Sequence, residues 1–518
     1  MSQAPGPDSR PRGWPSPEDA EQEWHYDRDR QAGPVPPLYA DTLGRWWLAA
    51  RDAAAGPSGL SPSRGLRLNG YWYTTRAPAT APSAAPPGGL GSRWEGEWSG
   101  ALAGWLTPWA EWPVAERSPS ELALLLIRSD DEGPRILRVA EDIRAAATVV
   151  WDTFQRDYRQ WLGADVAPTL TVADKPANYE TSRALWRLKE KVAAAGSAAP
   201  WLREAILDAS PGNLHDTRAA HPAGRVWLAA WDRFLDHHGR RCDEGGGLGP
   251  SWVEDPAVPL RLLQAYLDDV HRPANEQWRQ VRNQRDALAA EAAARVPEWA
   301  HFGARLSEAR WAHELLSHRT DDVAQQVAYR LRRVVAAIGD CLVEAGCLTR
   351  RGEVIYLTRE ECLAALHSPA VPLYPLARRR QAEVERQASW PPPPVAGGRH
   401  RPRMEPTHTS DTAWQGVAAA PGRVRGPVRV AATLGEAAAA RPGEILVAPL
   451  VTSQWAAGLP LVSGVVAAGG GHLASAGLTA AEFGLPAVTG IAGVTEALHS
   501  GEWIEVDGTR GTVHRLDG

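Results

Sequence analysis

The apolar positions in the central part of the chain recur every three or four residues. Beyond residue 141 they occupy Ile143, Ala147, Val150, Trp151, Phe154, Tyr158 and Trp161. This spacing is typical of an amphipathic helix, because it places the apolar side chains on one face. The same pattern predicts helices over 179–195, 226–238, 258–267, 274–294 and 323–345. We therefore expect a large, mostly α-helical domain.

The last hundred residues follow a different pattern of short apolar runs separated by turns. The runs predict strands over 417–419, 427–430, 445–448, 464–467 and 504–506, and helices over 475–483 and 494–498. Together these elements predict a compact α/β domain over residues 412–518. The fold class expected for the whole chain is thus multidomain, a helical domain followed by an α/β domain.

Composition divides the rest of the chain. Residues 1–20 are rich in Pro, Ser, Gly and charge, which predicts a disordered tail. We assign 21–388 to the helical domain, with an irregular Trp- and Pro-rich part up to about 140 that holds one strand-like piece at 66–73. The Pro- and Gly-rich residues 389–411 predict a linker.

One further local prediction lies near the end of the helical domain. The run 354–357 predicts a short strand, and Thr358 with Glu361 three residues later predicts the capping box of a following helix.

Charge and hydropathy exclude several classes of partner. The net charge is −5 and the basic residues are dispersed, which gives no basic field for nucleic acid. Apolar runs are interrupted before they reach the length of a membrane helix, and the N-terminus has no export signal. We therefore expect a cytoplasmic protein with no membrane partner.

The cysteines and histidines do not predict a metal site. The four cysteines, Cys242, Cys341, Cys347 and Cys362, are irregularly spaced and are interpreted as reduced thiols. His313 and His318 are five residues apart, which is not the His-Glu-x-x-His spacing of a zinc site. His313 and Glu314 are candidates to face a substrate cleft, although a solvated helix face is the commoner role.

The most informative stretch for function is a glycine-rich turn between a predicted strand and a predicted helix. Gly469, Gly470 and Gly471 permit backbone conformations closed to other residues and allow a ligand to approach the main chain. The helix expected to begin near Leu473 would present free N–H groups and a positive dipole end. Such a turn is suited to binding phosphate, although a flexible connection with no ligand is the simpler alternative.

This turn, with residues 480–490, resembles the phosphohistidine loop of the mobile domain of phosphoenolpyruvate-utilising enzymes. The resemblance covers nearly all of the terminal domain, which is therefore expected to be a swivelling β/β/α domain. Without a gap, the alignment places Ser475 where the family carries its phosphorylated histidine, and His472 one helical turn earlier. Either His472 carries the phosphoryl group, or the domain no longer carries phosphate on histidine. The catalytic candidates are accordingly His472 and Ser475.

Upstream, residues 178–188, 234–241, 252–256 and 309–363 resemble the central domain of rifampin phosphotransferase and phenylphosphate synthase-like proteins. The resemblance implies that this domain binds the phosphoryl acceptor, a small organic molecule. No segment of the sequence resembles an ATP-grasp domain. We therefore expect this chain to bind no cofactor itself and to receive its phosphoryl group through a separate ATP-grasp subunit that binds ATP and Mg²⁺.

A basic cluster within this resemblance supplies the candidate substrate-binding residues His238, Arg240 and Arg241. Arginine offers bidentate geometry to an anion, and histidine titrates near neutrality. The alternative is that these cations satisfy the last carbonyls of a helix, with Gly239 at its cap.

Three functions remain open. The first is a phosphotransferase component in which the swivel carries a phosphoryl group to an acceptor hydroxyl. The second is a repurposed enzyme, lyase- or dehydratase-like, whose two domains close on a substrate for non-phosphoryl chemistry. The third is a non-catalytic homologue. The 24 tryptophans, most of them expected in helix packing, favour a bulky, partly apolar small molecule.

Overall fold

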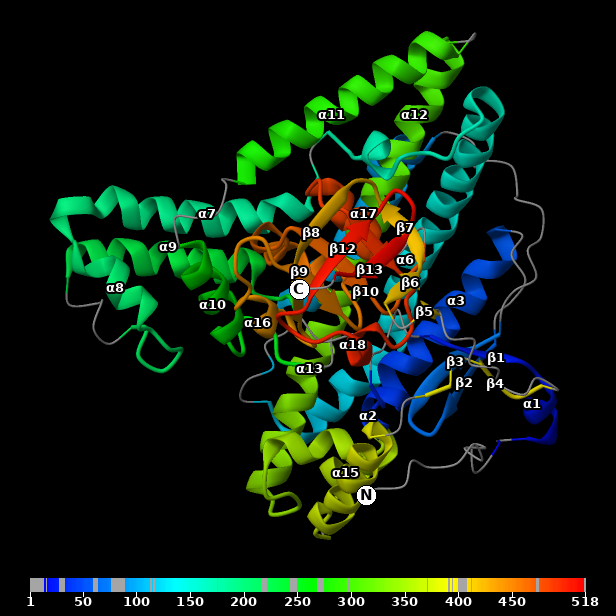
Figure 1. The fold of residues 1–518 in the computed structure, drawn as a ribbon. Helices are drawn as coiled ribbons and strands as arrows, with labels where there is room; N and C mark the ends of the chain where they lie inside the picture. The colour runs from blue at the N-terminus through cyan, green and yellow to red at the C-terminus, as the bar shows by residue number, and fades with distance from the viewer. Residues whose placement is uncertain are drawn as a thin grey trace. The chain divides into compact units, whose positions relative to one another are not determined.

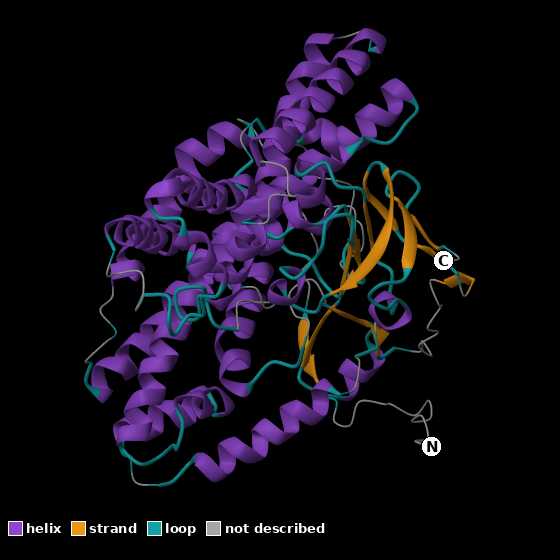
Figure 2. Cartoon of the chain, turned by 60° about the vertical axis from the view of Figure 1, so that its left-hand side comes forward, coloured by secondary structure: helices purple, strands orange, loops and turns teal. Residues whose placement is uncertain are grey.

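A computed structural model describes residues 14–516 apart from 15, 28–32, 59–63, 76–88, 112–113, 115–116, 175, 216–220, 243–248, 268–273, 297–298, 370, 390–391, 394, 399–407, 411 and 472–474. The chain divides into two compact units: the first holds 1–81, 105–141 and 330–405, and the second holds 82–104, 142–329 and 406–518. Most of the predicted disordered tail lies outside the described residues. Helix is the predominant structure (Figure 2), and no helix in the described ranges has the length and hydropathy to cross a membrane.

The first unit combines helices with a small antiparallel sheet whose strands run in the order β2-β3-β1-β4. Its elements are α1 (Pro17–Glu21), β1 (Trp24–Tyr26), α2 (Pro37–Tyr39), α3 (Arg45–Ser58), β2 (Gly65–Leu68), β3 (Tyr71–Thr74), α14 (Arg359–His367), α15 (Tyr374–Ala388) and β4 (Val395–Ala396). Three helices contribute residues to both units, namely α5 (Ser99–Glu111), α6 (Pro119–Leu162) and α13 (Thr320–Glu344).

Two sequence predictions in this unit need correction. The piece at 66–73 is not one strand but a hairpin, because Asn69 and Gly70 both have positive φ (49° and 84°) and reverse the chain between β2 and β3. The predicted strand over 354–357 is wrong: Arg351–Tyr356 forms a 3₁₀ helix, η7. The buried Glu353 accepts backbone hydrogen bonds from Thr349 and Arg350, which favours a turn over an extended strand. The capping box of Thr358 and Glu361 at the start of α14 is confirmed.

The helical part of the second unit confirms the predicted helices, with extended bounds. It contains α4 (Leu90–Arg93), α7 (Asn178–Ala195), α8 (Trp201–Leu207), α9 (Pro222–His238), α10 (Ala257–Tyr266), α11 (Ala274–Arg295) and α12 (Trp299–Glu314). A π-helical segment, η6 (Leu315–Arg319), joins α12 to α13. Trp227, Trp231 and Trp252 are fully buried in this part, as expected for tryptophans that pack helices together.

The C-terminal part of the second unit, yellow to red in Figure 1, contains a mixed sheet. Its nine strands run in the order β5-β6-β13-β12-β8-β9-β10-β11-β7, with β8, β9, β10 and β11 parallel. The strands are β5 (His408–Ser410), β6 (Ala413–Gln415), β7 (Val417–Ala420), β8 (Arg423–Val430), β9 (Ile445–Ala448), β10 (Gly464–Ala467), β11 (Ala487–Thr489), β12 (Trp503–Asp507) and β13 (Thr512–Arg515). The helices are α16 (Leu434–Ala437), α17 (Ser475–Glu482) and α18 (Val494–Ala497).

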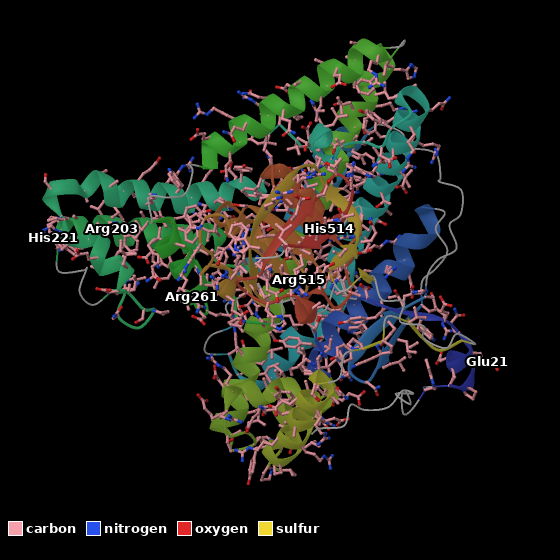
Figure 3. All side chains as sticks on the ribbon, in the orientation of Figure 1. Glu21, Arg203, His221, Arg261, His514 and Arg515 are labelled. Carbon is pink, nitrogen blue, oxygen red and sulfur yellow. The ribbon has the colours of Figure 1, made fainter. Side chains whose placement is uncertain are left out.

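The two faces of this sheet belong to different cores, because successive strand residues point to opposite faces. Ile445 and Val447 of β9 join a core formed within the C-terminal part. Arg515, labelled in Figure 3, borders that core: its guanidinium lies 5.4 Å from the centroid of the Trp414 ring. Leu446 of β9 instead joins a core that includes Trp231 of α9. The helical and C-terminal parts of the second unit therefore share one hydrophobic core.

Candidate functional site

The glycine-rich turn directly follows the central parallel strand β10. Gly470 has a φ of 105°, a conformation that residues with a side chain rarely adopt. The Gly469 amide donates a hydrogen bond to the Pro449 carbonyl at 2.9 Å, and the Gly469 carbonyl accepts one from Gly490 at 3.3 Å. These two hydrogen bonds therefore hold the turn against the residues that directly follow β9 and β11. The phosphate-binding role of Gly469, Gly470 and Gly471 stays a prediction.

Helix α17 begins at Ser475, and the catalytic candidate His472 lies outside the described residues. The Ser475 hydroxyl donates a hydrogen bond to Oδ2 of Asp321 at 2.9 Å. Asp321 is in the first turn of α13, and its Oδ1 is 3.5 Å from Nη2 of Arg144 on α6. The structure thus places Ser475 against a carboxylate of the helical part, which is itself paired with an arginine.

The other end of α17 carries a fully buried carboxylate, that of Glu482. Its Oε1 accepts a hydrogen bond from the Ser317 hydroxyl at 2.7 Å, and its Oε2 accepts one from Nδ2 of Asn178 at 2.9 Å. Nε2 of the buried His313 lies 3.3 Å from Oε1 but finds no aligned hydrogen-bond partner in the described part of the chain. All three of these neighbours come from the helical part of the second unit.

The hydrogen-bond network fixes the proton positions around Asn178. Its Nδ2 donates to Glu482 and to the Ser317 carbonyl, so its Oδ1 faces Nδ1 of His318 at 3.1 Å. His318 therefore donates from Nδ1. Burial is the largest cause that lowers the pKa of His318, to about 4, so the ring is neutral near pH 7.

Glu314 is the group in this cluster best placed to exchange a proton near neutral pH. The pKa of its carboxyl is raised to about 7, first by burial and then by the nearby Glu482, while Arg319 opposes both effects. Nε of Arg319 lies 3.3 Å from one carboxylate oxygen. An acid with such a pKa is half-ionised at the pH at which general acid–base catalysis operates best.

The substrate-binding candidates at the end of α9 are only partly brought together. His238 is half-buried and its Nδ1 lies 3.3 Å from the Thr181 hydroxyl. Burial and then the charge of Arg241 lower the pKa of His238 to about 4, so its ring is neutral near pH 7. Arg241 is buried, whereas Arg240 is exposed. The substrate-binding role of His238, Arg240 and Arg241 stays a prediction.

Gly239 is the C-cap residue of α9, as the alternative interpretation expected, but a left-handed conformation is not the reason for a glycine there. Gly239 has a φ of −77°, which any residue adopts. A Cβ atom at this position would lie 2.3 Å from the Leu235 carbonyl oxygen. Close backbone approach therefore explains this glycine.

Sequence reasoning missed most of the residues around α17. Glu482 lies within residues 480–490, which resemble the mobile domain of phosphoenolpyruvate-utilising enzymes. Its partners Asn178 and Ser317, however, are uncharged and lie far from it in the sequence. Asp321 likewise gave no local signal, because an acidic residue in the first turn of a helix is common. Only the three-dimensional fold brings these groups together.

Two segments of the chain match domains of known proteins. Residues 440–511 match the mobile domain of PEP-utilising enzymes. Residues 141–320 match the fourth domain of rifampicin phosphotransferase. The first match contains the glycine-rich turn and α17, and the second contains the partners of Glu482.

Two of the similar proteins are named phosphotransferases and a third is named a synthase. Rifampicin phosphotransferase of Streptomyces sviceus is 26% identical over 377 residues, which cover 69% of this chain and 42% of that protein. The uncharacterised phosphotransferase YvkC of Bacillus subtilis is 25% identical over 359 residues, 65% of this chain and 42% of YvkC. Chondramide synthase cmdD of Chondromyces crocatus is 27% identical over 366 residues, 65% of this chain and 9% of the synthase.

The chain spans less than half the length of each of these relatives. Its two matched segments follow in the order expected from the resemblance. The chain thus carries a segment similar to the fourth domain of rifampicin phosphotransferase, followed by a segment similar to the mobile domain of PEP-utilising enzymes.

Proposed function

We propose that this chain is the acceptor-binding and swivelling part of a phosphotransferase that acts on a small organic molecule. The helical part holds the acceptor hydroxyl, and the C-terminal part delivers a phosphoryl group carried on His472. ATP and Mg²⁺ are bound by a separate ATP-grasp subunit. This chain itself binds neither of them.

One observation supports the proposal: the start of α17 contacts the helical part through Ser475. Ser475 occupies the position of the carrier histidine in the resemblance, and its hydroxyl is hydrogen-bonded to Asp321 at 2.9 Å. Arg144 lies beside Asp321. An arginine and a carboxylate at this point suit phosphoryl transfer, which depends on positioning and on stabilising charge.

The transfer balances as a simple displacement. The P–N bond to the imidazole of His472 breaks as the acceptor oxygen forms a bond to phosphorus. The hydroxyl proton moves to a carboxylate, for which Asp321 is a candidate. The bond electrons of P–N return to the imidazole nitrogen.

The test is intact-protein and phosphopeptide mass spectrometry without acid, after incubation with ATP, Mg²⁺ and a candidate partner subunit. We expect an acid-labile phosphate in the wild type and in Ser475→Ala, and none in His472→Ala. An absence of phosphate in the wild type, with a partner shown to be active on another carrier, would refute the proposal.

A second candidate is a repurposed enzyme that carries out lyase- or dehydratase-like elimination. The observation that favours it is Glu314, whose pKa of about 7 suits acid–base catalysis and has no part in phosphoryl carriage. In that case activity survives His472→Ala but falls in Glu314→Gln. A non-catalytic homologue would show neither phosphate nor turnover in any variant.

A further inference from the structure

Helix α17 is buried along almost its whole length, yet it carries one carboxylate. Every residue from Ala476 to Glu482 is buried. A buried carboxylate without partners costs several kcal/mol, so a charge persists in such a place only when its oxygens are fully paired. Both oxygens of Glu482 are paired.

All the hydrogen bonds that satisfy Glu482 cross from the C-terminal part to the helical part. Ser317 lies in η6 and Asn178 is the first residue of α7. Apolar packing accompanies them: the Tyr179 and Phe483 rings stack with centroids 4.3 Å apart and planes 14° apart. If α17 left this position, Glu482 would lose all of these partners at once.

Apolar packing and hydrogen bonds contribute differently to the contact between α17 and the helical part. Apolar packing stabilises association but is tolerant of small shifts. Hydrogen bonds to a buried charge depend on distance and angle, so they select one position. The Ser317 and Asn178 bonds therefore specify how far along, and at which rotation, α17 rests on the helical part.

We propose that Glu482 is a positioning residue that seats α17 on the helical part, so that the start of this helix faces Asp321 and Arg144 whenever the C-terminal part is docked there. The seating itself does not depend on the proposed function. Its consequence for transfer to the acceptor does rest on that function. Without Glu482, α17 would rest on the helical part in several positions, and the phosphoryl group carried near its start would no longer reach one fixed point.

The test is hydrogen exchange of the full chain, with Glu482→Gln and Ser317→Ala compared with the control Glu496→Gln. Glu496 is an exposed glutamate of α18, in the same C-terminal part. We expect the amides of α17 to exchange about tenfold faster in both test variants, since a charge-assisted hydrogen bond is worth roughly 1.4 kcal/mol or more. Exchange in β9 and β10 should not change in any variant.

A double variant separates positioning from general destabilisation. Ser317→Ala should add less to Glu482→Gln than it costs alone, because both substitutions alter the bond between Ser317 and Glu482, whereas Glu496→Gln should leave the effect of Ser317→Ala unchanged. Protection of α17 that is unaltered in both single variants, or faster exchange throughout β9 and β10, would overturn the proposal.

Phosphoryl chemistry supplies a separate readout. If the chain is phosphorylated, Glu482→Gln should slow transfer to the acceptor and leave loading from ATP unchanged. Equal slowing of both steps counts against positioning. Should no protein be loaded, the proposed function fails while hydrogen exchange still decides whether Glu482 seats α17.

Discussion

Replacing Glu314 by Gln should remove a pH dependence of stability that the wild-type chain shows between about pH 4.5 and 7. The carboxyl is nine-tenths or more buried and faces Glu482 of α17, His313 of its own helix and Arg319. Its pKa is about 7 in the folded chain against 4.5 for the free group. Between these values the folded chain retains a proton that the unfolded chain has released.

The sign and the size follow from this difference. Stability is greatest below pH 4.5, where both states are protonated, and it falls by 1.36 kcal/mol per pH unit until about pH 7. The total is about 3 kcal/mol for a shift of roughly 2.5 units. Glutamine is neutral throughout, so the variant should gain about 3 kcal/mol on the wild type between pH 4.5 and pH 8.

The assay is urea unfolding of both proteins at several pH values. Hydrogen exchange of α12 and α17 then shows whether the change in stability arises in the second unit, which contains Glu314. The lowered pKa values of His238 and His318 act in the opposite direction, because stability then rises with pH from about 4 towards 6.5. Both histidines are present in the two proteins, so their effect cancels in the difference. A wild-type minus variant difference that is constant from pH 4.5 to 8 would refute the reasoning.

Two predictions concern the first unit. Glu353→Gln should lower the stability of that unit by about 2 kcal/mol at pH 7, because the carboxylate accepts charge-assisted hydrogen bonds from Thr349, Arg350 and Arg378. Burial is the largest single effect on the pKa of Glu353 and raises it, but these hydrogen bonds together outweigh burial and lower the pKa to about 2. Wild-type stability should therefore be lost as pH falls from about 4.5 through 2. Urea titrations at pH 7 and pH 3 check this, and an equal deficit at both would contradict it. Gly70→Ala should cost about 1–2 kcal/mol, since the residue has a φ of 84° and a Cβ atom would lie 2.3 Å from Oε1 of Gln387. The matched change Gly163→Ala, at a φ of 68° with open space around the Cβ, isolates the backbone strain from the clash.

The periodic elements could be predicted from the sequence because their signals are local. Helices α7 and α9 and the strands β9 and β10 carry clear apolar patterns, and the structure confirms them. The first half of α6 was missed, because Gly133 and Pro134 interrupt its sequence while the surrounding packing keeps the helix continuous. Residues 354–357 were misassigned because a short apolar run does not distinguish a strand from a single helical turn.

The site was predictable only where a motif marks it. The glycine-rich turn and Ser475 could be named as candidates, since their spacing is local and matches a known pattern. Glu482 and its partners Asn178, Ser317 and His313 come from separate segments, and only their burial in one network shows that they act together. The low pKa of His238 was also beyond sequence reasoning, because burial is its main cause.

The π-helical segment η6 sets the register between the residues that meet the two ends of α17. Ser317, which bonds Glu482, lies within it, and Asp321, which bonds Ser475, follows it in α13. A π turn holds one residue more than an α turn, and each residue of an α-helix rotates the direction of its side chain by about 100°. Deletion of one residue of η6 after Ser317 would therefore turn Asp321 to another face, while Ser317 and Asn178 still bond Glu482. A change of a single residue in chain length can thus redirect one contact of α17 without touching the other, which gives a lineage of such proteins a short route to a new delivery point on an unchanged fold.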